Sequence, residues 1–144
     1  MINIALLQPE MPGNVGSVIR TCSCFGYKLY LVGPVGFPIH TQIFKRYAAS
    51  HLIEPIYFNS NTEFFTNTKE YQKIGTSAHA ETSYSLFQFT SNMIVLFGSE
   101  SKGLQNIANE LKVNIKIPME KKGKCLNLAV SVGIIAAHYF SQNL

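Results

Sequence analysis

The chain has 144 residues, of which 47% are hydrophobic and 14% are charged. That length suits one globular domain, residues 1–144, and the apolar content excludes wholesale disorder. A formal charge of +4 permits contact with a polyanion but does not require it. Three cysteines cannot all pair within one chain and no signal peptide precedes the first apolar run, so we expect a reducing, cytoplasmic setting.

Short apolar runs alternate with segments of helical periodicity in the first half of the chain. Asn14 is expected to cap the first helix, and Gly26 is expected to end it. In chain order the expected elements are a strand at 1–7, a helix at 15–25, a strand at 28–32, a helix at 43–49, a strand at 56–58 and a helix at 62–69.

The second half continues the same alternation, which predicts a parallel sheet with helices on both faces. The final helix is apolar nearly all round, so we expect its own sheet and a partner subunit to cover it. Its apolar stretch, Leu126 to Phe140, is interrupted by polar residues and too short for a bilayer. The expected elements are strands at 72–76 and 93–97, a helix at 104–111, a strand at 113–117 and a helix at 127–142.

Ligands of an open parallel sheet bind at the carboxyl ends of its strands. Three loops there carry glycine or asparagine, at residues 8–14, 97–103 and 118–127. In the second loop, Gly98 and Gly103 would let backbone approach a ligand, and Glu100 adds an acceptor. The alternative is a glycine-bearing turn that only caps a helix.

Several other chemistries find no support in the sequence. No segment has the glycine spacing of a dinucleotide fingerprint or of a phosphate-binding P-loop. Cys22 and Cys24 lie on a predicted helix without a nearby histidine, so we interpret them as core residues and expect no metal site. The four histidines show no ligand spacing and no catalytic-triad context.

Three segments together resemble the motifs of the SpoU class of RNA 2'-O-ribose methyltransferases. They are Pro12–Arg20, Leu96–Leu104, and Ile117–Met119 followed by Leu126–Ile134. The whole chain is similar to the small subgroup that methylates the tRNA wobble nucleotide. The resemblance implies an α/β fold, the parallel-sheet, Rossmann-like SPOUT fold with a C-terminal trefoil knot, and a homodimer. It also implies S-adenosyl-L-methionine (SAM) as cofactor, with S-adenosyl-L-homocysteine as product and no metal.

The resemblance places cofactor-binding residues in the loops that would form the knot. Cys125 departs from the family pattern, which commonly has serine there. A tyrosine of some relatives aligns with Ala137, and Tyr139 is a misplaced stand-in. The implied cofactor-binding residues are Thr76, Gly98, Ile117, Cys125, Leu126 and Asn127.

The resemblance also supplies the catalytic residues, Arg20, Asn14 and Glu100, with the arginine coming from the partner subunit. A guanidinium is always protonated, so we assign Arg20 to phosphate clamping and alkoxide stabilisation rather than to a base. Asn14 would orient Arg20 or the ribose, and Glu100 would hold its loop or a partner group; both could instead be helix caps. The predicted RNA-binding residues are Lys45, Arg46, Lys121, Lys122 and Lys124.

The sequence leaves alternatives for the function. The same motifs serve enzymes acting on ribosomal RNA, so an rRNA 2'-O-methyltransferase is one alternative to a tRNA enzyme. A non-catalytic RNA-binding protein on the same fold is another. A nucleotide-binding oxidoreductase lacks its fingerprint after the first strand. For either methyltransferase we expect no association with a membrane.

Overall fold

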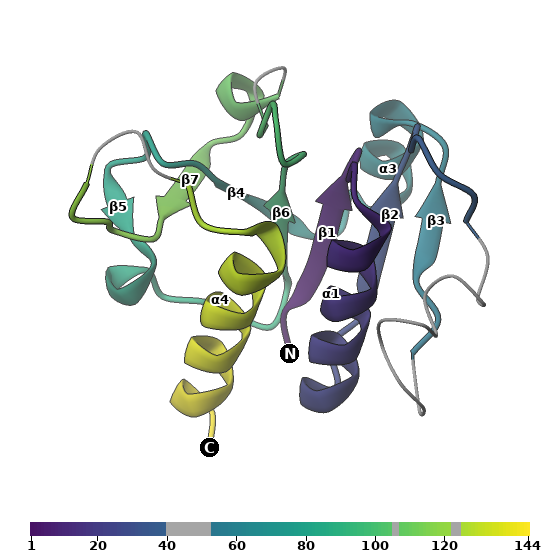
Figure 1. Ribbon diagram of the computed structural model, residues 1–144. Coiled ribbons are helices and arrows are strands. Elements are labelled where there is room, and N and C mark those ends of the chain that lie inside the picture. The colour runs from purple at the N-terminus through teal and green to yellow at the C-terminus, as the bar shows by residue number, and fades with distance from the viewer. Residues whose placement is uncertain (40–52, 105–106, 122–124) are drawn as a thin grey trace.

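The computed structural model describes residues 1–39, 53–104, 107–121 and 125–144. Within them, seven strands form one parallel sheet in the order β3-β2-β1-β6-β4-β7-β5 (Figure 1). The strands are β1 (Asn3–Leu7), β2 (Leu29–Val32), β3 (Ile56–Phe58), β4 (Gln72–Thr76), β5 (Thr82–Ser83), β6 (Met93–Phe97) and β7 (Val113–Lys116). The α-helices are α1 (Pro12–Phe25), α3 (Asn61–Asn67) and α4 (Leu128–Gln142). The predicted α/β architecture with a parallel sheet is confirmed.

Helices cover both faces of the sheet. On one face, α1 and α4 lie side by side (Figure 1) and bury Val18 of α1 and Ile135 of α4 in a common core. On the other face, Phe64 of α3 packs in a second core with Leu104 and Ile107. The segment after β6 therefore crosses the face opposite to α4.

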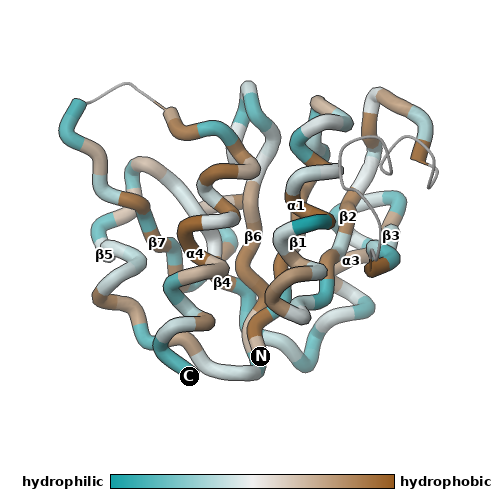
Figure 2. The backbone as a smooth tube through the Cα atoms, turned by 60° about the horizontal axis from the view of Figure 1, so that its bottom comes forward, coloured by the Kyte–Doolittle hydropathy of each residue, from teal (hydrophilic) through white to brown (hydrophobic). Residues whose placement is uncertain are grey.

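β1 and β6 form the buried centre of the sheet. Every residue of both strands is buried, and Leu6 of β1 lies beside Leu31 of β2 and Phe97 of β6. Successive side chains point to opposite faces, so Ile4 and Leu6 enter the core under α1 and α4 while alternate residues enter the other. In Figure 2, where the tube is coloured by the hydropathy of each residue, the brown of these central strands marks their hydrophobic residues. Burial on both faces explains their continuous apolar runs.

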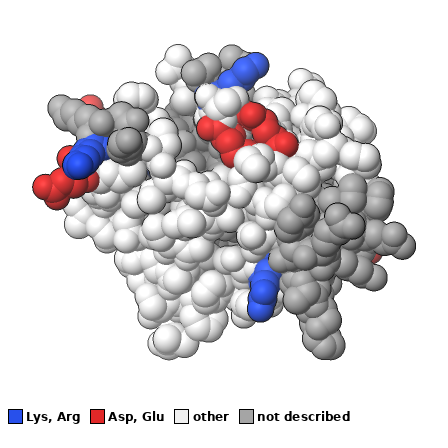
Figure 3. All heavy atoms as spheres, viewed as in Figure 1, with Lys and Arg blue, Asp and Glu red and all other residues white. Residues whose placement is uncertain are grey.

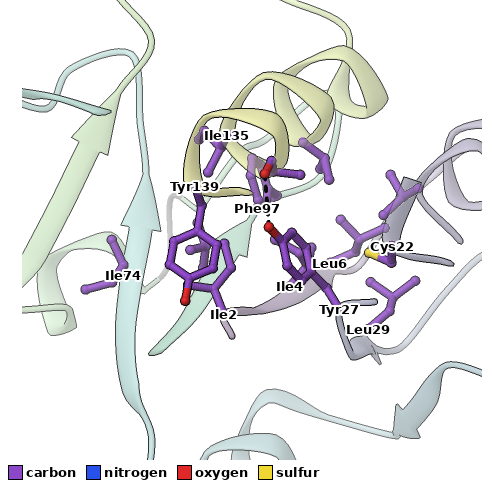
Figure 4. Packing of buried hydrophobic residues seen from close by; sticks show 14 of the residues in the cluster. Ile2, Ile4, Leu6, Cys22, Tyr27, Leu29, Ile74, Phe97, Ile135 and Tyr139 are labelled. Atoms are coloured by element: carbon purple, nitrogen blue, oxygen red, sulfur yellow. Dashed lines mark hydrogen bonds between the residues drawn. The ribbon is translucent and has the colours of Figure 1, made fainter. Parts of the chain in front are cut away.

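An aromatic group ties α4 to the rest of the core (Figure 4). The Tyr27 hydroxyl donates to the Ala136 carbonyl of α4 over 3.1 Å. Tyr139 is 5% exposed and its ring lies 5.8 Å from that of Tyr27, so it is a core residue. The other side of α4 leaves apolar residues in solvent, with Val130 49% and Phe140 41% exposed.

The structure corrects two predicted elements. The α-helix expected at 104–111 is wrong, because its described part holds only a 3₁₀ turn, η2 (Ala108–Glu110). The side-chain amide of Asn114 donates to the carbonyls of Ala108 and Leu111 over 3.2 and 3.5 Å, which ends the turn there. The two-residue strand β5 and the 3₁₀ turn η1 (Tyr84–Leu86) that follows it were not expected from the sequence. The helix expected at 43–49 lies outside the described residues.

The two cysteines of α1 differ from each other. Cys22 is buried as predicted, and burial raises the pKa of its thiol to about 12. Cys24 is exposed, so its assignment to the core is wrong. Positions two apart on a helix point about 200° apart, and only one of them can face the sheet. All three cysteines, including Cys125, are free thiols.

Candidate active site

The β1–α1 loop brings Asn14 into the first turn of α1. Helix α1 begins at Pro12, whose fixed φ and missing N–H suit the first helical position. Met11 is therefore the N-cap, and it makes no side-chain cap bond. The prediction that Asn14 caps this helix is wrong. Asn14 is buried, and its side chain bonds to residues of other segments and not to its own helix.

Glu100 lies at the amino end of α1. Its carboxylate accepts hydrogen bonds from the backbone N–H groups of Glu10, at 3.0 Å, and Met11, at 2.8 Å. It also accepts from the side-chain amide of Asn14 at 3.4 Å. A negative group is stabilised at the positive end of a helix dipole. Glu100 thus caps α1 from the loop after β6.

Asn127 joins the same network from the other end of the chain. Its side-chain amide donates to Oδ1 of Asn14 over 3.0 Å. Its own Oδ1 accepts from the N–H of Val130 over 3.2 Å and so caps α4. Glu100, Asn14 and Asn127 therefore form one continuous chain of hydrogen bonds that links all three motif segments.

The loop after β6 folds back on itself. Gly103 donates its N–H to the carbonyl of Ser99 over 2.9 Å and adopts the left-handed φ of 60°. A Cβ on Gly98 would overlap the backbone of Gly103 and Leu104. Gly98 is therefore required by the closure of the loop itself, whatever its role toward a ligand. The expectation that this loop opens a regular helix is not met in its described residues.

The other predicted cofactor-binding residues lie at the carboxyl ends of neighbouring strands. Thr76 ends β4, and its hydroxyl donates to the carbonyl of Leu96 in β6 over 2.9 Å. Ile117 follows β7 directly and is half-buried. Cys125 and Leu126 precede α4 and are exposed. These positions face the same edge of the sheet as Gly98, and their part in cofactor binding stays a prediction.

Arg20 stands apart from this network. It is exposed on α1, six residues after the buried Asn14. Six residues correspond to about 600° of rotation, or about 240° around the helix axis, and to a rise of about 9 Å. The two side chains of one subunit therefore leave α1 on different sides. An orienting contact from Asn14 to Arg20 within one subunit does not fit this geometry.

Among the predicted RNA-binding residues, only Lys121 is described. It is exposed, in the segment that follows Pro118. Lys45, Arg46, Lys122 and Lys124 lie outside the described residues. Figure 3 shows the acidic side chains gathered over the start of α1, at the edge where the loops after β1 and β6 meet. The backbone N–H of Glu10 donates to the carboxylate of Glu100 across these two loops.

Sequence reasoning missed Glu10. Its carboxylate accepts from the N–H of Ser101 over 3.0 Å and from the Ser101 hydroxyl. These two bonds, side chain first, lower the pKa of Glu10 below its ordinary value. The only sequence signal was its place in the loop after the first strand. A carboxylate in such a loop could be hydrated by solvent or could accept hydrogen bonds from another part of the protein.

The described residues contain neither a metal-binding cluster nor a membrane-spanning helix. No cluster of three His, Cys, Asp or Glu side chains that could hold a metal ion occurs among the described residues. No helix within the described ranges is long and apolar enough to cross a membrane.

The chain matches a known family across nearly all of its length. The model of the SpoU rRNA Methylase family matches residues 1–137. The chain belongs to this family. The match contains all three segments whose polar residues meet in the hydrogen-bonded network described above.

Relatives of similar length share this sequence pattern from end to end. A tRNA (cytidine(34)-2'-O)-methyltransferase of Aeromonas hydrophila is 31% identical, with 99% of this chain and 94% of the relative covered. The enzyme of the same name from Escherichia coli K12 is 28% identical with the same coverage. The resemblance to the small wobble-nucleotide subgroup is thereby confirmed.

Solved structures of family members have the same fold. One, described as giving structural insights into the 2-OH methylation of C/U34 on tRNA, has a TM-score of 0.89 at 32% identity and covers 99% of this chain and 95% of its own. An AdoMet-bound rRNA methyltransferase from Sinorhizobium meliloti has a TM-score of 0.83 at 27% identity. This second match covers 99% of this chain but 57% of the larger protein.

Proposed function

We propose that this protein transfers a methyl group from SAM to the ribose 2'-hydroxyl of the wobble nucleotide, position 34, of tRNA. The observation that carries the proposal is the end-to-end similarity to enzymes of that name, at 31% identity over 99% of this chain. The network of Glu100, Asn14 and Asn127 supports it, because the residues that define the motifs are bonded to one another.

The residues present fit the cofactor. Met119 and Leu126 expose 37% and 38% of their surface beside the strand ends, where apolar side chains could pack against an adenine ring. Nearby lie the Thr76 hydroxyl and the backbone of the Gly98 loop, which offer polar contacts. When bound, SAM supplies an electrophilic methyl group on a sulfonium. The residues that would hold it are Thr76, Gly98, Ile117, Cys125, Leu126 and Asn127.

Arg20 acts on the RNA. Its guanidinium stays protonated, so it clamps phosphate and stabilises the negative charge that develops on the 2'-oxygen. Glu100 and Asn14 keep the loops after β1 and β6 in place around the reacting groups. Holding the hydroxyl and the methyl group in line accounts for a large part of such catalysis.

The active enzyme is a homodimer in which each site takes Arg20 from the partner subunit. Two observations favour this arrangement. Arg20 leaves α1 on a different side from Asn14, and α4 exposes Val130 and Phe140 next to α1. A second copy would cover these apolar side chains.

The C-terminal trefoil knot is also part of the proposal. β6 lies between β1 and β4, although β4 precedes it in sequence. The segments before and after β7 then pack on opposite faces of the sheet. The chain thus passes from one face of the sheet to the other around β7, and this path is compatible with α4 threading through the loop before it.

Basic residues around the site would bind the tRNA backbone. Lys121 is exposed near the end of β7, and the other four predicted contacts are Lys45, Arg46, Lys122 and Lys124. Such contacts would make the affinity depend on salt concentration. A tRNA substrate is consistent with the cytoplasmic setting expected from the cysteines.

Methyl transfer from labelled SAM to total RNA tests the proposal, with the RNA then separated into tRNA and ribosomal fractions, digested, and mapped for the methylated nucleotide. Label at the ribose of nucleotide 34 is the expected result. Label confined to ribosomal RNA would instead favour an rRNA 2'-O-methyltransferase, the activity in the name of the family. Binding of RNA without binding of SAM would instead identify a non-catalytic protein.

A further inference from the structure

The loops after β1 and β6 hold each other through two reciprocal sets of hydrogen bonds. In one direction, the Glu100 carboxylate accepts from the N–H groups of Glu10 and Met11. In the other, the Glu10 carboxylate accepts from the N–H and hydroxyl of Ser101. We call these four residues the clasp. Each loop thus supplies one carboxylate and receives the other.

The two halves of the clasp differ in their surroundings. Glu100 is half-buried and has a further bond to Asn14, so it belongs to the catalytic network. Glu10 is exposed, and its side chain bonds only to the β6 loop in the part of the chain described. Its contribution is therefore to the position of residues 98–103.

That position matters because the loop is tightly closed. The Ser99–Gly103 reversal leaves no room for a Cβ at Gly98, and Ser101 lies at its tip. Without Glu10, the N–H and hydroxyl of Ser101 would bond to water, and the tip would be free to move away from α1. The Gly98 backbone would move with it.

We propose that Glu10 is a positioning residue that holds the β6 loop in the conformation that binds SAM. It acts through Ser101 and does not touch the reacting atoms. The inference rests on the proposed function, since it takes SAM as the ligand of this loop. The lowered pKa of Glu10 agrees with a carboxylate that stays ionised to accept both bonds.

Four substitutions separate this role from general stability. Glu10→Ala removes the acceptor, and Glu10→Gln keeps an acceptor oxygen at the same distance from the backbone but loses the charge. Glu110→Ala is the matched control, because it removes an exposed carboxylate in η2, at the other end of β7. Ser101→Ala removes one of the two bonds and keeps the backbone donor.

The first measurement is amide hydrogen exchange in the cofactor-free protein. Glu10→Ala should accelerate exchange of the Ser101 amide by about tenfold, while the amides of β6 keep their wild-type rates. Glu110→Ala should change neither. Unchanged exchange at Ser101 would overturn the inference, as would equal acceleration throughout β6, because that would show loss of global stability instead of loop opening.

The second measurement is SAM affinity by calorimetry, together with steady-state kinetics. Glu10→Ala should weaken SAM binding about tenfold and raise its KM, leaving kcat at saturating SAM and the KM for tRNA near wild type. Glu10→Gln should recover most of the affinity, and Ser101→Ala should fall between. A wild-type affinity in Glu10→Ala would overturn the inference. If the wild-type protein itself bound no SAM, the proposed function would fail first, and the exchange data would still report the clasp.

Discussion

The side-chain amide of Asn127 donates a 3.0 Å hydrogen bond to Oδ1 of Asn14, although 113 positions separate them in the chain. Asn14 in turn donates to Glu100. A carboxamide is needed at position 14, because aspartate could not donate and an apolar residue could do neither. Asn127 likewise donates to Asn14 while its oxygen caps α4.

Substitutions at Asn127 should separate its two bonds. Asn127→Ala loses the helix cap and the bond to Asn14, so the free energy of unfolding should fall by about 1 kcal/mol and SAM binding should weaken. Asn127→Asp keeps an acceptor for the N–H of Val130, so it should preserve the cap and lose only the bond to Asn14. Urea unfolding and calorimetric SAM titration measure the two effects. Wild-type SAM affinity in Asn127→Asp would show that the bond to Asn14 is dispensable.

Gly98→Ala should disable the β6 loop. The added Cβ would overlap the backbone of Gly103 and Leu104, so the loop must open and SAM affinity should fall at least about tenfold. Gly36→Ala is the control, since a Cβ there meets nothing within 4 Å and should change stability by less than about 0.5 kcal/mol. Thermal unfolding and SAM titration of both variants provide the measurement. Tight SAM binding by Gly98→Ala would contradict the proposed position of the cofactor.

Arg20→Lys should lose most of the methyl transfer rate. Lysine keeps the charge but lacks the planar fork that binds phosphate in a bidentate manner, so we expect kcat to fall about 100-fold. The melting temperature should not change, because Arg20 is exposed. Single-turnover kinetics and thermal unfolding check both statements. Near-normal turnover would exclude the proposed role.

Mixed dimers test whether Arg20 acts across subunits. A dimer of one Arg20→Ala subunit and one Asn127→Asp subunit would contain one site with both defects and one with neither. Co-expression with two affinity tags and purification of the mixed species should therefore recover about half of the wild-type activity per dimer, one intact site of two. Activity no higher than that of the parent variants would place Arg20 and the cofactor loops in the same subunit.

Tyr27 should make stability depend on alkaline pH. Burial raises its pKa to about 12 from the ordinary 10.0, so the folded state holds its proton more tightly than the unfolded state. The resulting stabilisation is complete below pH 10 and is lost as the pH rises from there toward 12.

Tyr27→Phe should lower the free energy of unfolding by about 1 kcal/mol at neutral pH, through the lost bond to Ala136, and should flatten this alkaline decline. Cys22, also with a pKa of about 12, contributes in the same direction, so Tyr27→Phe should leave a residual slope. Urea unfolding of wild type and Tyr27→Phe between pH 8 and about 11 measures how the free energy of unfolding falls with pH. An equal fall in both proteins would contradict the role assigned to Tyr27.

The sequence was sufficient for elements whose burial is dictated locally. β6 was predicted with its observed bounds, because a strand buried on both faces is a short apolar run bounded by polar turns. β4 was also predicted with its observed bounds, although Gln72 at its start is exposed. The start of α1 was misplaced because asparagine is a common cap and the cap bond from Glu100 comes from a distant loop. The turn at η2 was misjudged for a similar reason, since Asn114 ends it from the next strand.

The composition of the site could be predicted only through resemblance. Asn14, Glu100 and Asn127 belong to the family motifs, and no local pattern in the sequence indicates that they bond to one another. That pairing depends on β6 lying beside β1, which is a property of the whole sheet. Glu10 went unnoticed because its partner Ser101 lies 91 positions away.

The place of β6 between β1 and β4 also sets an order of events when the chain is made. Because the ribosome releases the amino-terminal residues first, β1 and β4 emerge before the strand that separates them, and the sheet between them can be completed only when residues 93–97 follow. The network can close only when Asn127 arrives, after almost all the other elements have been synthesised. A chain interrupted before α4 could therefore form much of the sheet and still lack the last partner of Asn14. An incomplete copy would then have no assembled site with which to modify RNA.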